Sequence, residues 1–199
     1  MPGGLGSRQL ASGSASKPRQ RQSGRLHRAS GQAAGRGQPE AILDIGCGTG
    51  KLLKSAEAQF PGAKLVGVDA AIEMVKYAQA SNPSGHIQFK QAMAEELPFP
   101  DGSFDLVFST MTFHHRPNQS QDIAEIERVL TPRGRWVLAD FVPSGLMRYV
   151  PRLMGLHQLP ERGDLQGRLF EAGLKVVTKR RVPGLGGQIA VMSIAATPT

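Results

Sequence analysis

Apolar and polar positions along residues 41–196 follow two alternating patterns. Short apolar runs of strand length are separated by longer segments in which apolar residues recur every three or four positions. The short runs predict strands at about 41–45, 64–69, 86–90, 104–108, 135–141, 174–180 and 188–196. The helical spacing predicts helices over about 50–60, 71–80, 119–130 and 162–172.

Two residues support the predicted helix boundaries. Asn118 precedes the third helix, and its side chain is suited to accept a hydrogen bond from the free N–H groups of the first turn. Gly173 follows the last helix and can adopt the left-handed conformation that often ends a helix.

This order of elements predicts an α/β fold with a mostly parallel sheet covered by helices on both faces. The last two strands have no helix between them, so they must form a hairpin, and strand seven is then antiparallel to the others. We expect a Rossmann-like, doubly wound sheet of seven strands in one domain at 40–199. Ligands of such sheets bind at the carboxyl ends of the strands, where the strand order reverses beside strand one.

Residues 1–39 differ from the rest of the chain in composition. They are rich in Gly, Ser, Arg and Gln, and hold seven of the 24 Lys and Arg residues but no Asp or Glu. The other 17 basic residues nearly balance the 16 acidic ones, so most of the net charge of +8 belongs to this tail. Its few large apolar residues cannot build a core, so we expect it to be disordered. An organelle import signal, a nucleic-acid-binding arm and an extension without a role are the three interpretations.

The composition also indicates where in the cell the protein is located. No apolar run is long enough to cross a membrane. The single cysteine, Cys47, rules out an internal disulfide and is typical of a reducing compartment. We therefore expect a cytoplasmic protein, with organelle import through residues 1–39 as the alternative.

The run LDIGCGTG at residues 43–50 joins the first strand to the first helix. Its glycines allow left-handed backbone and close approach to a ligand, and the helix that follows adds free N–H groups. The dinucleotide fingerprint G-x-G-x-x-G fails, because Leu53 stands where the third glycine should be. A phosphate-binding Walker loop fails as well, because leucine follows Gly50 and Lys51. A nicotinamide oxidoreductase is therefore disfavoured.

Six segments carry a family resemblance through their order and spacing. They are LDIGCGTG at 43–50, GVDAAIEM at 67–74, QAMAEELPF at 91–99, SFDLV at 103–107, FHH at 113–115 and ERVLTPRG at 127–134. Together they resemble the motifs of class I S-adenosylmethionine-dependent methyltransferases of small molecules, which include the ubiquinone/menaquinone-biosynthesis C-methyltransferases. The resemblance covers roughly residues 40–199. It implies S-adenosylmethionine as the cofactor and a small-molecule methyl acceptor.

The resemblance implies a cofactor site built from the ends of the first four strands. The expected cofactor-binding residues are Asp44, Gly46, Cys47, Gly48, Gly50, Asp69, Ala70, Met74, Met93, Ala94, Glu95 and Ser109. Asp69 ends the second strand, where its carboxylate can accept both ribose hydroxyls, at roughly 1.5–3 kcal/mol for each bond. Asp44 either anchors the glycine turn or meets the cofactor's ammonium group through water. Met74 packs either on the adenosyl group or in the core.

Two departures from the family pattern concern the cofactor and the acceptor. The family usually has an acid at the position of Met93, which cannot accept a bond from the adenine amino group. The N–H of Ala94 can still reach the ring and Glu95 can replace the acid, but a lost bond would weaken binding about tenfold. Family members also usually carry helices before the first motif, whereas residues 35–39 run almost directly into strand one. We therefore expect an acceptor site that is open, incomplete or covered by a partner subunit.

His114 and His115 follow the fourth strand, on the side where the acceptor should bind. Methyl transfer has a neutral leaving group, so it needs positioning and, for a protonated acceptor, a base. We expect one of these histidines to orient or deprotonate the acceptor, and simple packing in the loop is the alternative. Asp140 alone does not make a carboxylate set for a metal ion, so no metal is expected.

Residues 146–157 are rich in Met and Leu, with Arg148 and Arg152 between them. In the family this region often lines the acceptor pocket, which favours an apolar or lipid-like acceptor, although a short helix packed on the sheet is the alternative. The sequence therefore predicts a small-molecule methyltransferase. A methyltransferase fold that binds without catalysis and a nucleic-acid methyltransferase that uses the basic tail are the other hypotheses.

Overall fold

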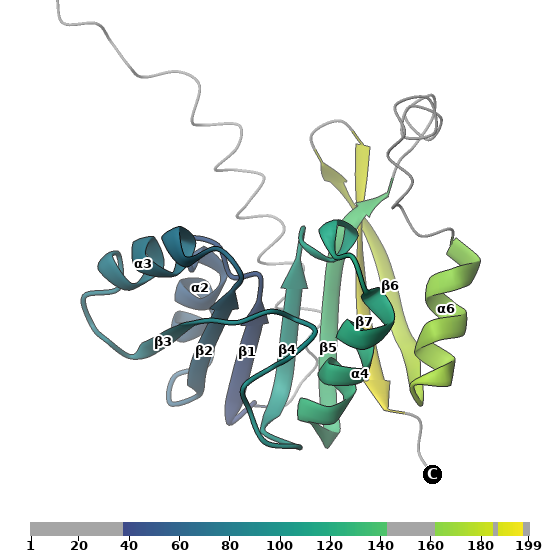
Figure 1. Cartoon of the computed structure of the whole chain (residues 1–199), viewed down its shortest axis with the longest axis horizontal. Helices are drawn as coiled ribbons and strands as arrows, with labels where there is room; N and C mark the ends of the chain where they lie inside the picture. The colour runs from purple at the N-terminus through teal and green to yellow at the C-terminus, as the bar shows by residue number, and fades with distance from the viewer. Residues whose placement is uncertain (1–37, 143–161, 185–186, 197–199) are drawn as a thin grey trace, which may run out of the picture.

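The computed structural model describes residues 38–142, 162–184 and 187–196. Its centre is a seven-stranded sheet in the order β3-β2-β1-β4-β5-β7-β6 (Figure 1). The strands are β1 Ala41–Ile45, β2 Lys64–Asp69, β3 Ile87–Gln91, β4 Phe104–Thr110, β5 Leu130–Val142, β6 Leu174–Gly184 and β7 Gly187–Ala196. The predicted Rossmann-like, doubly wound fold is confirmed.

Strand β7 is antiparallel to both of its neighbours, β5 and β6. The β1–β2, β1–β4, β2–β3 and β4–β5 pairs are all parallel. The predicted hairpin of the last two strands is therefore confirmed. The strand order reverses between β1 and β4, so the carboxyl ends of these two strands lie side by side.

Three strands are longer than the apolar pattern predicts. β4 continues to Thr110, β6 continues to Gly184, and β5 begins at Leu130 instead of near residue 135. The start of β5 pairs with Phe104 across an irregularity in the β4–β5 register. Pro132 and Gly134 are typical turn residues, so only the tertiary pairing shows that the strand has already begun.

Helices cover both faces of the sheet and enclose two apolar cores. They are α2 Lys51–Gln59, α3 Ile72–Ala80, α4 Gln119–Val129 and α6 Arg162–Glu171, with a short 3-10 helix η1 at Phe113–His115. Apolar residues of α2 and α3 pack with one face of the sheet, and those of α4 and α6 pack with the other. Figure 1 shows α4 and α6 on the side nearer the viewer.

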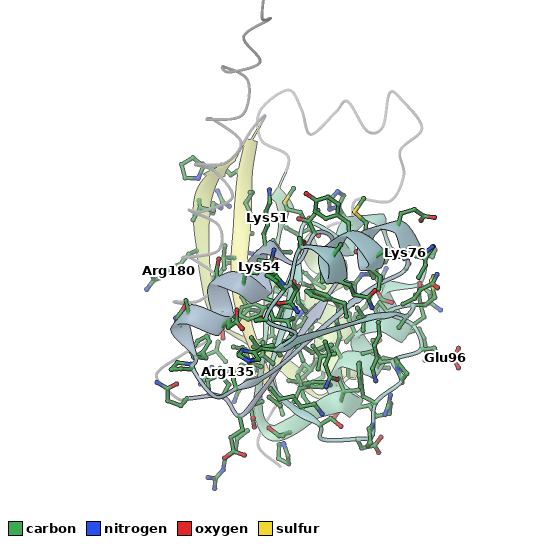
Figure 2. All side chains as sticks on the ribbon, turned by 90° about the vertical axis from the view of Figure 1, so that its left-hand side faces the viewer. Lys51, Lys54, Lys76, Glu96, Arg135 and Arg180 are labelled. Atoms are coloured by element: carbon green, nitrogen blue, oxygen red, sulfur yellow. The ribbon has the colours of Figure 1, made fainter. Side chains whose placement is uncertain are left out.

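The outer faces of the helices carry exposed lysines, and two residues at helix ends behave as the sequence predicts. Lys51 on α2 and Lys76 on α3 are exposed at the outer surface (Figure 2). The Asn118 side chain accepts a hydrogen bond from the Gln121 N–H at 3.2 Å, and Gly173 follows α6 with a φ of 68°.

The predictions for the tail and for residues 146–157 concern residues that lie outside the described ranges, apart from 38 and 39. Within those ranges, each helix is too short or too polar to cross a bilayer.

Candidate active site

The glycine turn, residues 46–50, lies at the carboxyl end of β1 and is held by β2. The N–H groups of Gly46 and Cys47 both donate to the carbonyl oxygen of Val68, at 2.8 and 3.0 Å. A Cβ on Gly46, whose φ is +75°, would lie 2.5 Å from the Thr112 side chain. Gly48, in contrast, has open space where its Cβ would be. The turn is therefore tightly packed on one side and open to a ligand on the other.

Asp69 stands at the end of β2 and organises the backbone around it. Its Oδ2 accepts the Gly48 N–H at 2.8 Å, and its Oδ1 accepts the Ala71 N–H at 3.0 Å. The Ala92 N–H donates to the Asp69 carbonyl oxygen at 3.2 Å, which joins the chain after β3 to the same point. Because each carboxylate oxygen can accept two hydrogen bonds, Asp69 retains acceptor capacity for a ligand.

Asp44 is a buried carboxylate in β1, with 2% of its surface exposed. Burial raises its pKa to about 7, the nearby charge of Asp69 acts in the same direction, and Arg116 acts against it. Its Oδ1 has no hydrogen-bond partner among the described residues. The bonds that hold the glycine turn come from Val68 and Asp69 instead. A buried acid of this kind suits a cationic ligand group, such as the ammonium group of S-adenosylmethionine.

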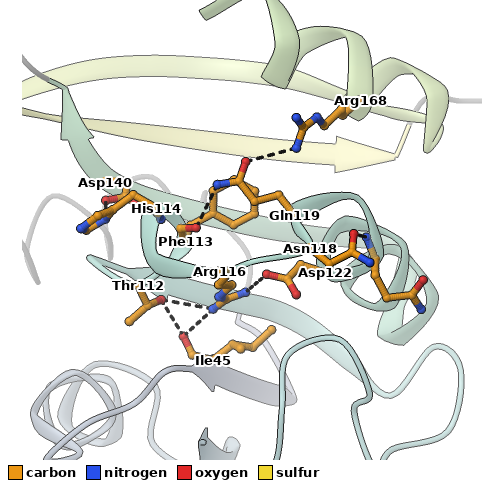
Figure 3. A network of polar contacts seen from close by, with 11 residues as sticks. Ile45, Thr112, Phe113, His114, Arg116, Asn118, Gln119, Asp122, Asp140 and Arg168 are labelled. Carbon is orange, nitrogen blue, oxygen red and sulfur yellow. Dashed lines mark hydrogen bonds and ion pairs between the residues drawn. The ribbon is translucent and has the colours of Figure 1, made fainter. Parts of the chain in front are cut away.

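Arg116 connects the end of β1 to the segment after β4 (Figure 3). It donates to the Ile45 carbonyl oxygen at 3.2 Å, to Thr112 Oγ1 at 3.1 Å and to Asp122 Oδ2 at 3.1 Å. Burial raises the pKa of Asp122 to about 6, although Arg116 opposes this shift. This buried ion pair could not be predicted from the sequence, because its groups come from separate elements and match no short motif.

His114 and Asp140 meet where β4 and β5 end (Figure 3). The His114 N–H donates to Asp140 Oδ2 at 2.9 Å, and His114 Nδ1 lies 2.5 Å from Asp140 Oδ1. His115 belongs to η1, and its side chain lies outside the described part of the structure. In the sequence, Asp140 stood out only as a lone carboxylate that is too little to hold a metal ion, and no short motif indicated its contact with His114.

The residues expected on the adenine side lie around the ends of β2 and β3. Met74 in α3 and Met93 after β3 are 42% and 53% exposed, so neither is a core methionine. Ala94 packs partly against the α4 side of the sheet, and Ala70 is exposed. Glu95 is half-buried, and its charge helps to raise the pKa of the Asp122 carboxyl group. Glu95 therefore lies toward α4.

An ion-pair network fixes the chain that follows Met93. The Leu97 N–H donates to Glu125 on α4 at 2.8 Å, while Arg128 donates to the carbonyl oxygens of Leu97 and Phe99 at 3.0 and 2.8 Å. The hydrogen bond from Arg128 holds the pKa of Glu125 below its usual value. This anchoring gives the chain after Met93 a defined backbone although residues 92–102 form no helix.

Two expected cofactor contacts are buried. Ser109 was expected past the fourth strand, but it lies inside β4 with 0% exposure, because the strand continues to Thr110. Cys47 packs its side chain into the core beside α2, and burial raises the pKa of its thiol. Any contact of these two residues with a ligand must therefore use the backbone. Among the described residues, no group of three or more His, Cys, Asp or Glu side chains is arranged to hold a metal ion.

Comparison with known proteins agrees with this geometry. The sequence profile of a methyltransferase domain matches residues 43–138. A demethylmenaquinone methyltransferase of Deinococcus radiodurans is 38% identical over 131 residues, which are 64% of this chain and 54% of the relative. An uncharacterized methyltransferase of Synechocystis is 32% identical over 170 residues, which are 80% of this chain and 77% of the relative. The chain therefore belongs to the methyltransferase family.

A solved structure shows the shared fold. Geranyl diphosphate C-methyltransferase from Streptomyces coelicolor, in complex with Mg2+, geranyl diphosphate and S-adenosyl-L-homocysteine, matches with a TM-score of 0.74 and 15% identity. The match covers 90% of this chain and 82% of that one. The chain spans about half the length of the Deinococcus relative, 54%.

Proposed function

We propose that this protein transfers a methyl group from S-adenosylmethionine to a small, apolar acceptor. The observation that carries the proposal is the buried Asp44 carboxylate, which has an unpartnered oxygen in β1, two residues before a glycine turn that is open at Gly48. Membership in the methyltransferase family supports the same interpretation. When bound, S-adenosylmethionine supplies an activated methyl group.

We assign the parts of the cofactor to residues at the ends of the strands. Asp69 accepts the ribose hydroxyls, since its carboxylate retains acceptor capacity beside two backbone N–H groups. Asp44 faces the ammonium group, and the glycine turn takes the backbone of the methionyl part. Met74 and the N–H of Ala94 contact the adenine ring. Placing a cation beside Asp44 compensates the cost of its burial.

We infer an apolar acceptor from Met111, an exposed methionine directly after β4. It is 37% exposed, and a flexible methionine suits an irregular apolar ligand. Met111 also adopts a φ of 58°, which turns the chain from β4 toward His114. The Deinococcus relative is named for a quinone acceptor, which is apolar as well. We place this reaction in the cytoplasm, because the one cysteine suits a reducing compartment.

A weakly active or purely binding protein is the second candidate. Met93 offers no acceptor for the adenine amino group, and Glu95 lies toward Asp122 on α4. One missing bond to a polar group lowers affinity about tenfold. Such a protein would bind S-adenosylhomocysteine but transfer no methyl group.

Calorimetric titration with S-adenosylhomocysteine tests the cofactor assignment. The wild-type chain is expected to bind it, and Asp69→Ala is expected to weaken binding by about 100-fold, because two charge-assisted bonds are lost. Glu127→Ala, an exposed position on α4, serves as the control with unchanged affinity. Absence of binding to the folded wild-type chain would overturn the proposal, and an unchanged affinity of Asp69→Ala would overturn the ribose assignment.

A further inference from the structure

Arg116 directly follows η1, and only 8% of its side chain is exposed. Its guanidinium group donates to the Ile45 carbonyl oxygen at 3.2 Å and to Thr112 Oγ1 at 3.1 Å (Figure 3). Thr112 Oγ1 itself donates to the same carbonyl oxygen at 3.2 Å. The guanidinium carbon also lies over the ring of Phe113, 5.8 Å from its centre. A planar cation that is held on several sides in this way has a fixed position.

These contacts place Arg116 at the packed side of the glycine turn. Ile45 is the last residue of β1, and Gly46 follows it. Thr112 contacts Gly46 so closely that an added Cβ would lie 2.5 Å from the Thr112 side chain. One guanidinium group therefore holds the end of β1 to the chain that follows β4. Since Asp44 precedes Ile45, the positive charge acts on the buried Asp44 carboxylate as well.

The titratable groups around Asp44 come from three parts of the fold. Asp69 at the end of β2 adds to the effect of burial and raises the pKa of Asp44, whereas Arg116 lowers it. Cys47 in the turn is the third neighbour, and its thiol stays protonated because burial, Asp44 and Asp69 all raise its pKa. Within the described part of the chain, Arg116 is thus the cation among these neighbours.

Asp122 on α4 controls how much of this positive charge acts on its surroundings. Its Oδ2 accepts a hydrogen bond from Arg116 at 3.1 Å, and its side chain is 0% exposed. Its Oδ1 has no hydrogen-bond partner among the described residues. Burial raises the pKa of Asp122 to about 6, Arg116 opposes this shift, and the charge of Glu95 adds to it. Asp122 is therefore ionised at neutral pH and cancels part of the charge of Arg116.

We infer, on the basis of the proposed function, that Arg116 is a positioning residue of the cofactor site. It holds the glycine turn against the segment after β4, and its charge favours the ionised Asp44 carboxylate that receives the ammonium group of S-adenosylmethionine. Asp122 holds the guanidinium group and limits its effect on Asp44. The ion pair is therefore part of the cofactor site although neither partner contacts the cofactor.

Replacing one partner or the other should change the pH dependence of S-adenosylhomocysteine binding in opposite directions. Calorimetry of the full chain near pH 6 and near pH 8 gives a ratio of association constants, which is expected to be about 10 in the wild-type protein. Asp122→Asn leaves the whole charge of Arg116 beside Asp44 and should lower the ratio to about 3. Arg116→Met removes the cation and should raise the ratio to about 30. Both values correspond to a shift of about 0.7 pH unit in the ionisation of Asp44.

A role that is limited to packing predicts a different result. A loosened site weakens binding by the same factor at both pH values, so the ratio stays at about 10. Arg116→Lys keeps the charge but loses the planar fork, so it should weaken binding about tenfold at both pH values without changing the ratio. Glu127→Gln removes a carboxylate from an exposed position of the same helix and is the matched control, with both constants unchanged.

The outcome for Asp122→Asn and Arg116→Lys decides the inference even if Arg116→Met does not fold. A ratio that stays at about 10 in Asp122→Asn, or a ratio that rises there, would overturn the inference alone. A wild-type ratio near 1 would overturn it as well, because Asp44 would then not titrate in this interval. Absence of S-adenosylhomocysteine binding to the folded wild-type protein would overturn the proposed function instead.

Discussion

Asp44 is expected to make the affinity for S-adenosylhomocysteine depend on pH. Burial, followed by the charge of Asp69, raises the pKa of the Asp44 carboxyl group to about 7, and Arg116 limits the shift. A protonated Asp44 is neutral and cannot attract the ammonium group of the ligand. The ligand therefore binds to the ionised form, and at acid pH binding must displace a proton.

The magnitude follows from the ionised fraction of Asp44. With a pKa of about 7, about one tenth of the carboxyl groups are ionised near pH 6, and about nine tenths are ionised near pH 8. The association constant should therefore rise about tenfold over this interval, which is about 1.4 kcal/mol. Calorimetry in two buffers with different ionisation enthalpies measures both the constant and the number of protons released.

Asp44→Asn is the control for this prediction, because it keeps the shape of the side chain and removes its titration. It should bind more weakly near pH 8 and lose the pH dependence. The raised pKa also means that the folded state binds the proton more tightly than the unfolded state. The wild-type free energy of unfolding should therefore fall as pH rises from about 4 to about 7, and the slope should be smaller in Asp44→Asn. A wild-type affinity that stays constant between these pH values would refute the reasoning.

Three further substitutions test other parts of the site. Arg116→Met should lower the free energy of unfolding by about 3–5 kcal/mol, because the buried Asp122 loses its cationic partner and must keep an uncompensated charge or take up a proton. Urea unfolding measures the loss. Asp122→Asn added to Arg116→Met should restore a large part of it, so additive losses would argue against a coupled pair. Met93→Asp should tighten S-adenosylhomocysteine binding about tenfold by accepting the adenine amino group, and an unchanged Kd in calorimetry would place Met93 away from adenine. Gly46→Ala should weaken the binding of S-adenosylhomocysteine and lower the Tm, because the added Cβ would lie 2.5 Å from the Thr112 side chain. Gly62 also has a positive φ but lies in open space, so Gly62→Ala should lower the Tm only through backbone strain.

The local pattern of apolar and polar residues in the sequence was sufficient to predict most of the fold. The alternation of strands and helices and the missing helix before β7 predicted both the parallel sheet and its antiparallel strand. The glycine turn and Asp69 were found because strand, turn and helix signals follow one another within a few residues. The early start of β5 was missed, since Pro132 and Gly134 favour a turn when tertiary pairing is unknown.

The contacts between distant residues could not be predicted from the sequence. His114 and Asp140 are 26 residues apart, and Arg116 reaches the carbonyl oxygen of Ile45 across 71 residues. Neither pair has a characteristic spacing, because each forms only when the ends of neighbouring strands meet. The predicted strand order indicated that these strand ends lie close together, but it did not indicate which side chains are in contact. The roles of the individual site residues therefore stay predictions until ligand binding is measured.

The proposed dual role of Asp69, as an anchor of the glycine turn and as a ligand contact, has a consequence for how fast a ligand binds. Its carboxylate already holds the N–H groups of Gly48 and Ala71, so the turn is ordered during folding rather than during binding. The conformational entropy of ordering is then a cost of folding, and association should lack a slow rearrangement step. Loss of Asp69 would remove this ordering together with the proposed ligand contact. Amide exchange at Gly48 without ligand would separate the two effects, since only the loss of ordering accelerates it.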